Sequence, residues 1–186
     1  MRRFQIPTII LMVCAFLSQD LGQTREQTTV HTASAAAKGK SDAVIVKYLD
    51  LPWGEKTFTS IEKGEDDYYG TRGWPFARLV INVPVHIEDH ALAAGNYAIV
   101  LTPAKKAQPL SVSVIKLNDD KEFLQPGNIF VEVPPGQTIF SEVANFETVA
   151  QSAADHMKVT LESDEKGISM TVLYGNRKFI RLFTVD

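Results

Sequence analysis

Short apolar stretches that end in proline or glycine recur along the chain and predict strands. Residues 43–51 are dense in Val, Ile, Tyr and Leu and end at Pro52, as a buried strand does. Leu110, Val112 and Val114 alternate with serines, which is the period of a strand with one wet face. We expect further strands at residues 56–61, 76–87, 96–102, 128–133, 157–162, 168–174 and 177–185.

Turn-forming residues between these stretches predict antiparallel pairing. Residues 163–167 (Ser-Asp-Glu-Lys-Gly) read as a hairpin loop, and Gly175-Asn176 is a two-residue turn of the kind that hairpins favour. Pro84 lies inside the 76–87 stretch, which indicates an edge strand or a bulge there. Many short strands with regular turns predict a mainly β fold, an antiparallel β-sandwich.

One stretch has a helical period instead. Val143, Phe146, Val149 and Ala150 lie at helical spacing within residues 141–156, where alanine is frequent. We expect a short amphipathic helix there, and the alternative is an irregular connection between strands. The predicted sandwich therefore contains at most one short helix.

The chain begins with two arginines followed by the mostly apolar residues 4–17, the pattern of a secretory signal peptide. A membrane-spanning helix needs about 20 apolar residues, which favours cleavage over anchoring. We expect residues 1–23 to be a signal peptide and the protein to be exported, to the periplasm or the exterior, with no membrane contact after cleavage. An N-terminal anchor is the alternative. Lipidation of Cys14 is disfavoured because Val13 stands where a small residue is required.

The rest of the chain divides by composition. Residues 24–42 are rich in Thr, Ala, Ser, Lys and Gly and nearly lack large apolar residues, so we expect a disordered tether there, with a solvated His31. Residues 43–186 are long enough for a single β-sandwich domain.

Charge and cysteine content exclude several classes of protein. The 19 Lys and Arg residues against 22 Asp and Glu give a net charge of -3, which argues against a nucleic-acid partner. The single cysteine excludes a disulfide framework and any zinc or redox site built from cysteine pairs.

Two groups of residues suggest metal chemistry. His86, Glu88 and His90 are evenly spaced, and imidazole with carboxylate suits zinc; exposed polar residues at a strand end account equally for the pattern. Carboxylates between Glu62 and Asp67, or at residues 118–120, offer oxygen ligands for calcium, although a solvated acidic turn has the same composition. We expect no cofactor, with zinc or calcium as the alternatives.

Aromatic residues gather around glycines just before the 76–87 strand. Exposed rings beside hydrogen-bonding side chains are a common means of gripping sugars or peptides. The alternative is that the rings cap one end of the core. The candidate ligand-binding residues are Tyr68, Tyr69, Arg72, Trp74 and Phe76.

The segment Leu-Ala-Ala-Gly-Asn-Tyr at residues 92–97, followed by an apolar strand and Pro103, is similar to the Leu-Pro-Ala-Gly-x-Tyr turn of the exported bacterial domain-of-unknown-function 2911 family (DUF2911). The resemblance covers about three quarters of the chain and implies an exported β-sandwich without an established activity. Where that family carries Asn and Glu, this chain has Trp74 and Pro75, so no polar chemistry is carried over.

Motifs of common enzyme classes are absent from the sequence: it has no G-x-S-x-G, no P-loop, no G-x-G-x-x-G and no H-E-x-x-H. Together with the aromatic cluster, this predicts a non-catalytic binding module of the cell envelope that takes a carbohydrate or a peptide. The alternatives are a metal-dependent hydrolase that uses His86, Glu88 and His90, and a structural or assembly protein that pairs through a sheet edge.

Overall fold

A computed structural model of the chain describes residues 28–65, 73–105, 108–128, 131–149 and 154–185. The described elements are β1 (Val30–Ala37), β2 (Lys40–Leu49), α1 (Glu55–Lys63), β3 (Trp74–Ile81), β4 (Val85–Ile87), β5 (His90–Leu92), β6 (Gly95–Thr102), β7 (Ser111–Leu117), β8 (Gly136–Val143), β9 (Glu147–Thr148), β10 (Ala154–Asp164), β11 (Gly167–Gly175) and β12 (Arg177–Val185).

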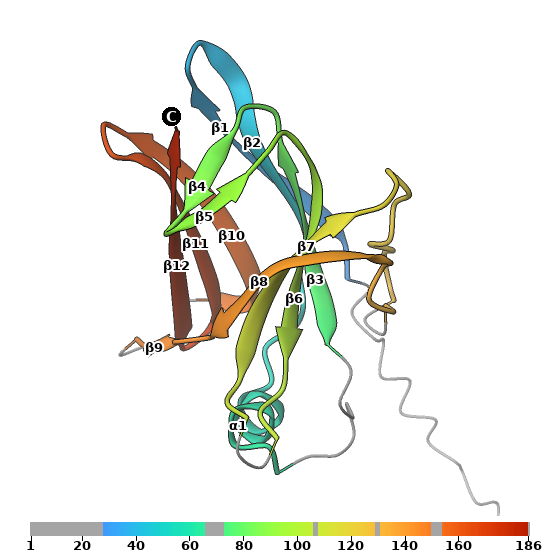
Figure 1. Cartoon of the computed structure of the whole chain (residues 1–186). Helices are drawn as coiled ribbons and strands as arrows, with labels where there is room; N and C mark the ends of the chain where they lie inside the picture. The colour runs from blue at the N-terminus through green and yellow to red at the C-terminus, as the bar shows by residue number, and fades with distance from the viewer. Residues whose placement is uncertain (1–27, 66–72, 106–107, 129–130, 150–153, 186) are drawn as a thin grey trace, which may run out of the picture.

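Two antiparallel sheets contain these strands (Figure 1). The first sheet has the order β1-β2-β3-β6-β7-β8, and the second has the order β10-β11-β12-β4-β5, with β9 beside β12. Strand β1, at the edge of the first sheet, lies against β10, at the edge of the second. The arrangement confirms the predicted mainly β fold, an antiparallel β-sandwich with one short helix.

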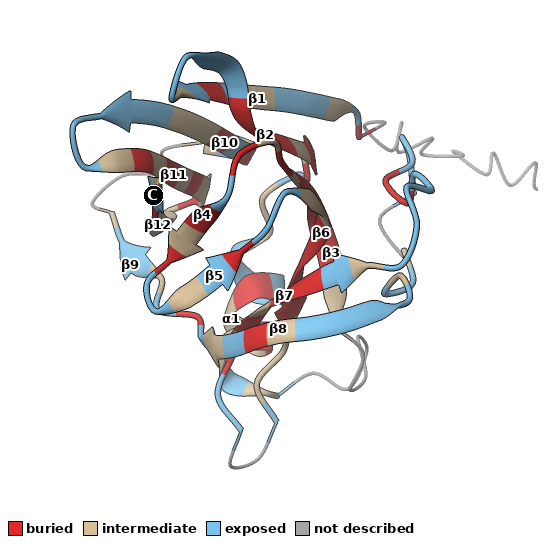
Figure 2. Cartoon of the chain, turned by 45° about the horizontal axis from the view of Figure 1, so that its top comes forward, coloured by how far each residue is buried: buried red, intermediate tan, exposed pale blue. Residues whose placement is uncertain are grey.

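The core lies between the inner faces of the two sheets, where Figure 2 shows the buried residues in red. Leu79 and Ile99 of the first sheet and Val172 and Phe183 of the second are almost fully buried, because alternate residues of each strand point inward. Burial of such apolar surface is the main force that holds a sandwich together.

The turn that carries the family resemblance opens β6. Gly95 has a φ of 153°, which residues with a Cβ rarely adopt. Tyr97 then enters the core, where burial raises the pKa of its phenol. Its hydroxyl donates a hydrogen bond to the carbonyl oxygen of Ala93 at 2.7 Å, so the buried polar group is satisfied.

The predicted tether over residues 24–42 is wrong for its described part. Residues 30–37 form β1, which pairs with β2 through a tight turn at Lys38 and Gly39, where φ is 48° and 76°. Ala35 is buried, so small side chains suffice where the backbone supplies the pairing. Composition missed this strand because the stabilising contacts come from β2 rather than from its own side chains.

The helix lies elsewhere than expected. Residues 56–61, predicted as a strand, belong to α1, in which Phe58 and Ile61 face the core three residues apart. Gly64, with a φ of 66°, ends this helix by donating its N–H to the carbonyl oxygen of Ser60.

The helix predicted over residues 141–156 is also wrong. This segment contains the end of β8, the short β9 and the start of β10, and residues 150–153 lie outside the described part. Phe146 packs against Phe58 and Phe179 with ring centroids 5.1 and 5.3 Å apart. Contacts with distant elements therefore decide the local structure over its helical period.

The predicted long strand over residues 76–87 is divided in two. Strand β3 ends at Ile81, and the exposed Pro84 lies before β4, which belongs to the other sheet. Asn82 donates its side-chain N–H to the carbonyl oxygen of Asp42 at 2.6 Å. The proline therefore marks the crossing between the sheets rather than an edge or a bulge. Of a further expected strand, at residues 128–133, residues 129–130 lie outside the described part, and the described residues 131–133 precede β8, which begins at Gly136, without belonging to a strand.

Candidate functional site

The predicted aromatic site is only partly visible. Tyr68, Tyr69 and Arg72 lie outside the described residues. Phe76 is 5% exposed and belongs to the core. Trp74, at the start of β3, is half-buried and lines a pocket at the end of the sandwich where α1 lies.

This apolar pocket lies between the two sheets and α1. Its cavity volume is about 20 Å³, and a single water needs about 10–15 Å³ on the same measure. The pocket therefore admits a small aliphatic group, whereas a sugar ring is too large for it. Its described lining residues are Leu51, Phe58, Trp74, Phe76, Leu101, Phe146, Met157, Val172 and Tyr174.

Aromatic rings from distant parts of the chain support one wall of the pocket. Trp53 packs edge-on against Tyr174 with centroids 4.9 Å apart, and Phe58 meets Phe146 in the same geometry. The Tyr174 hydroxyl donates to the carbonyl oxygen of Pro52 at 2.9 Å. Such edge-on pairs are a favoured geometry for aromatic rings. The wall is therefore held in place without a ligand.

Close backbone approach is required beside this wall. Gly175 has a φ of 58°, and a Cβ at this position would lie 2.0 Å from the Trp53 ring. The indole can therefore rest on the backbone only because residue 175 is a glycine. The sequence identified this glycine as a turn residue, but its second role required the position of Trp53.

An ion pair ties α1 to the second sheet beside the same rings. Arg177 donates Nη2–H to Glu62 Oε2 at 3.0 Å and Nε–H to Glu62 Oε1 at 3.2 Å, and its guanidinium lies 5.8 Å from the Phe58 ring centroid. The hydrogen bonds to Glu62 raise the pKa of Arg177. Because both oxygens of Glu62 accept hydrogen bonds from Arg177 in a bidentate pair, the guanidinium of Arg177 holds α1 in place.

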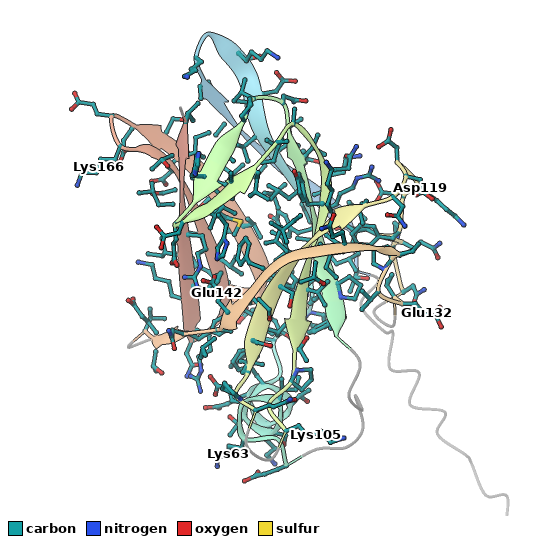
Figure 3. The ribbon with its side chains drawn as sticks, viewed as in Figure 1. Lys63, Lys105, Asp119, Glu132, Glu142 and Lys166 are labelled. Carbon is teal, nitrogen blue, oxygen red and sulfur yellow. The ribbon has the colours of Figure 1, made fainter. Side chains whose placement is uncertain are left out.

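A second ion pair joins the sheets on the β8 side. Arg181 of β12 pairs with Glu142 of β8, and its guanidinium lies 4.1 Å from the Phe179 ring centroid. Figure 3 labels Glu142 on β8, on the side toward the second sheet. Both arginines of β12, Arg177 and Arg181, are therefore held in ion pairs with carboxylates of other elements.

The histidines of the predicted metal site lie on opposite faces of the second sheet. Glu88, with a φ of 52°, begins the two-residue turn between β4 and β5, so Ile87 pairs with His90 and His86 pairs with Ala91. Because the chain reverses here, even spacing no longer means a shared face. His90 stacks on Phe140 with centroids 4.3 Å apart.

Other acidic groups are also engaged within the protein. Glu62 binds Arg177, and Asp119 accepts a hydrogen bond from the backbone N–H of Lys121 at 3.0 Å; Asp119 is labelled in Figure 3. Asp66 and Asp67 lie outside the described residues. Among the described residues, no group of three His, Cys, Asp or Glu side chains is arranged to hold a metal ion.

A polar cluster that the sequence did not predict lies at the start of β1. His31 Nε2 lies 3.0 Å from Asp50 Oδ2 and 2.9 Å from Thr29 Oγ1, and the ring stacks on Tyr48. Thr29 Oγ1 also donates to Asp50 Oδ2 at 2.8 Å. A Ser-His-Asp relay needs the two ring nitrogens on different partners. Here one nitrogen faces both groups, so the cluster fits an anchor for β1.

Burial alone would raise the pKa of Asp50, but hydrogen bonds from the backbone and side chain of Thr29 and from His31 lower it below its usual value. The ionised carboxylate is therefore the form that the anchor stabilises. No local pattern reveals this cluster, because His31 and Asp50 are 19 residues apart.

The part of the chain that the structure describes contains no helix with the length and apolar character needed to cross a membrane. Comparison with protein-family models, curated proteins and solved structures finds no match to this chain. The candidate site is therefore interpreted from its own geometry.

Proposed function

We propose that the protein is an exported, non-catalytic binding module whose pocket at the α1 end takes an aliphatic side chain of a peptide. The observation that carries the proposal is the preformed apolar pocket beside Trp74. Ligand sites are typically concave and largely apolar before the ligand arrives. Export is supported by the N-terminal sequence and by the resemblance of residues 92–97 to the exported DUF2911 family.

The size and chemistry of the pocket favour a peptide over a carbohydrate. A sugar ring needs polar groups that orient its hydroxyls as well as a ring to stack on. The Tyr174 hydroxyl donates to a backbone oxygen of the protein, and the remaining described lining, apart from the indole N–H of Trp74, consists of hydrocarbon and thioether groups. A methyl group at the end of an aliphatic side chain matches both the volume and the apolar lining.

The arrangement of charged groups supports a binding role rather than catalysis. Arg177 and Arg181 are each held by a carboxylate, and Asp50 shares a single imidazole nitrogen with Thr29. The walls of the pocket are held by ring contacts and the Glu62–Arg177 pair, so little ordering entropy is lost when a ligand binds.

The test is a titration with blocked pentapeptides of the form Gly-Gly-X-Gly-Gly, in which X is Val, Leu or Ser. The chain contains two tryptophans; Trp74 lines the pocket and Trp53 supports its wall, so intrinsic fluorescence reports occupancy. We expect saturable changes with Val and Leu and none with Ser.

Two variants locate the response. Leu101→Phe and the milder Val172→Ile fill the pocket and should abolish the fluorescence change while the protein stays folded. Val143→Thr, at an exposed position of β8, should leave it unchanged. Equal responses to Ser and Leu peptides, or undiminished binding by both filled variants, would show that the pocket is only an end of the core.

A further inference from the structure

The outer face of the second sheet carries apolar side chains that are exposed to solvent. Alternation along β12 points Phe179 and Phe183 into the core and leaves Ile180 and Leu182 outside, 40% and 37% exposed. They are two of the four large hydrophobic residues that are exposed in the described chain. Neighbouring exposed apolar residues of this kind often mark an interaction surface.

The strand register arranges this face, formed by β10, β11 and β12, in three rows. The middle row is Thr160–Thr171–Ile180. On one side of it lies the row Lys158–Leu173–Lys178, and on the other side lies the row Glu162–Ser169–Leu182. The strands thus place two lysines at one end of the face and a carboxylate at the other, with the apolar and hydroxyl residues between them.

The charges at the two ends have no ion-pair partner among the described residues. Lys158 and Glu162 are exposed and enter none of the ion pairs of the described chain. Glu147 of β9 stands opposite Lys178 in the strand register, which leaves Lys158 as the unopposed cation of its row. Lys158 and Glu162 are four residues apart on β10, or about 13 Å, too far for a direct pair within one chain.

We propose that two copies of this chain associate through this face, about a two-fold axis that follows the Thr160–Thr171–Ile180 row. A two-fold interface requires a surface that is complementary to itself, and this charge pattern meets that requirement. The axis places Lys158 of each copy over Glu162 of the other, and Ile180 against Ile180. Leu182 then covers the aliphatic stem of Lys178 of the second copy.

The dimensions of the face set the strength of the contact. Three strands about 4.8 Å apart, each about nine residues long at about 3.3 Å per residue, cover roughly 430 Å² per copy. The total of about 860 Å² lies below the roughly 1,000 Å² of a stable specific interface, so we expect a weak, reversible dimer with a Kd in the micromolar range.

The experiment measures the Kd of the full-length chain by sedimentation equilibrium. We expect Lys158→Glu and Glu162→Lys each to raise the dimer Kd about tenfold or more, because like charges then face each other across the axis. The double variant, Lys158→Glu with Glu162→Lys, should return the Kd to within about threefold of the original. Because the two residues are not in contact within one chain, such a rescue comes from contact between copies.

Ile180→Lys, which places like charges at the centre, should leave a monomer. Lys116→Glu on the exposed surface of the first sheet is the matched control and should not change the Kd. The proposal is overturned by a protein that stays monomeric at about 500 μM, well above the micromolar Kd that this area implies, by a dimer that persists in Ile180→Lys, or by a double variant without rescue. Peptide binding at the α1 end is measured separately and does not depend on these results.

Discussion

The two outer faces of the sandwich differ in their exposure to solvent. Over the first sheet the connection between β7 and β8 folds back, and its Phe123 and Leu124 are 9% and 3% exposed. Over the second sheet Ile180 and Leu182 remain in water. A sandwich with one core between its sheets also has two outer faces. In this protein the connection between β7 and β8 covers the outer face of the first sheet, whereas the outer face of the second sheet stays exposed to solvent.

A buried arginine explains how the first face is closed. Arg78 of β3 is 5% exposed and donates to the carbonyl oxygens of Asp120 at 3.1 Å and Lys121 at 3.2 Å. Its Nη1 also lies 3.7 Å from Glu122 Oε2. The guanidinium carries several donors in a fixed plane, so one side chain holds three consecutive residues of the connection, Asp120 to Glu122. We call this set of contacts from Arg78 to the β7–β8 connection the clamp. Among its described residues, the outer face of the second sheet has no buried side chain that holds a connection in this way.

The N-terminal part of the described chain supports the same cover. The backbone N–H of Gly127 donates to both the carbonyl oxygen and the side-chain oxygen of Thr28, each at 3.0 Å. Thr29 then joins the Asp50 cluster. The start of β1 and the end of the β7–β8 connection are therefore held together. Strand β1, which the composition of residues 24–42 did not predict, thus supports the connection that covers the first sheet.

The largest effect should come from removing the clamp. Arg78→Met leaves the carbonyls of Asp120 and Lys121 without their donor and should lower the free energy of unfolding by about 3–5 kcal/mol, as breaking a buried charged network does. Urea denaturation followed by circular dichroism measures the change.

Lys47→Met is the matched control for the clamp. Lys47 pairs with the same Glu122 at 3.4 Å, but both side chains are about two-fifths exposed, so the loss should stay below about 1 kcal/mol. Equal losses for the two variants would contradict a special role for Arg78.

A pair of leucines compares the two faces directly. Leu124→Ala removes a buried side chain from the closed face and should lower the free energy of unfolding by about 2–3 kcal/mol. Leu182→Ala on the open face should change it by less than about 0.5 kcal/mol. Both are measured by urea denaturation at protein concentrations where the chain is monomeric. A Leu182→Ala loss as large as that of Leu124→Ala would mean that the second face is also covered.

The smallest effect concerns pH and the Asp50 anchor. Because the folded pKa of Asp50 lies below its unfolded value, its contribution to stability is present above the unfolded pKa of about 3.9 and is lost as pH falls through the folded pKa. We expect Asp50→Asn to lower the free energy of unfolding by about 1 kcal/mol at pH 7 and to lose less stability than the original chain between pH 5 and 2.

Thermal unfolding at a series of pH values measures this effect. Asp155→Asn, at an exposed carboxyl group, serves as the control and should keep the original pH profile. An Asp50→Asn profile that is parallel to that of the original chain would show that the cluster does not couple protonation to folding.

Local patterns predicted the mainly β fold because strand alternation and turn residues act over a few positions. The alternation at residues 110–114 corresponds to β7, and Gly175-Asn176 does join β11 to β12. Trp74 was also identified as a candidate binding residue, and it lines the pocket. Where the pattern was ambiguous, as over residues 141–156, packing partners elsewhere in the chain decided the structure.

The amino-acid sequence by itself therefore determined the fold class, because strand alternation and turn residues act between near neighbours in the chain. Tertiary structure decided which groups meet. It brought Trp53, Phe58 and Tyr174 together, placed His86 and His90 on opposite faces, and buried Arg78 beneath the β7–β8 connection. The physical reason is that such contacts join residues far apart in the chain, and only the pairing and packing of the two sheets determine which of those residues become neighbours.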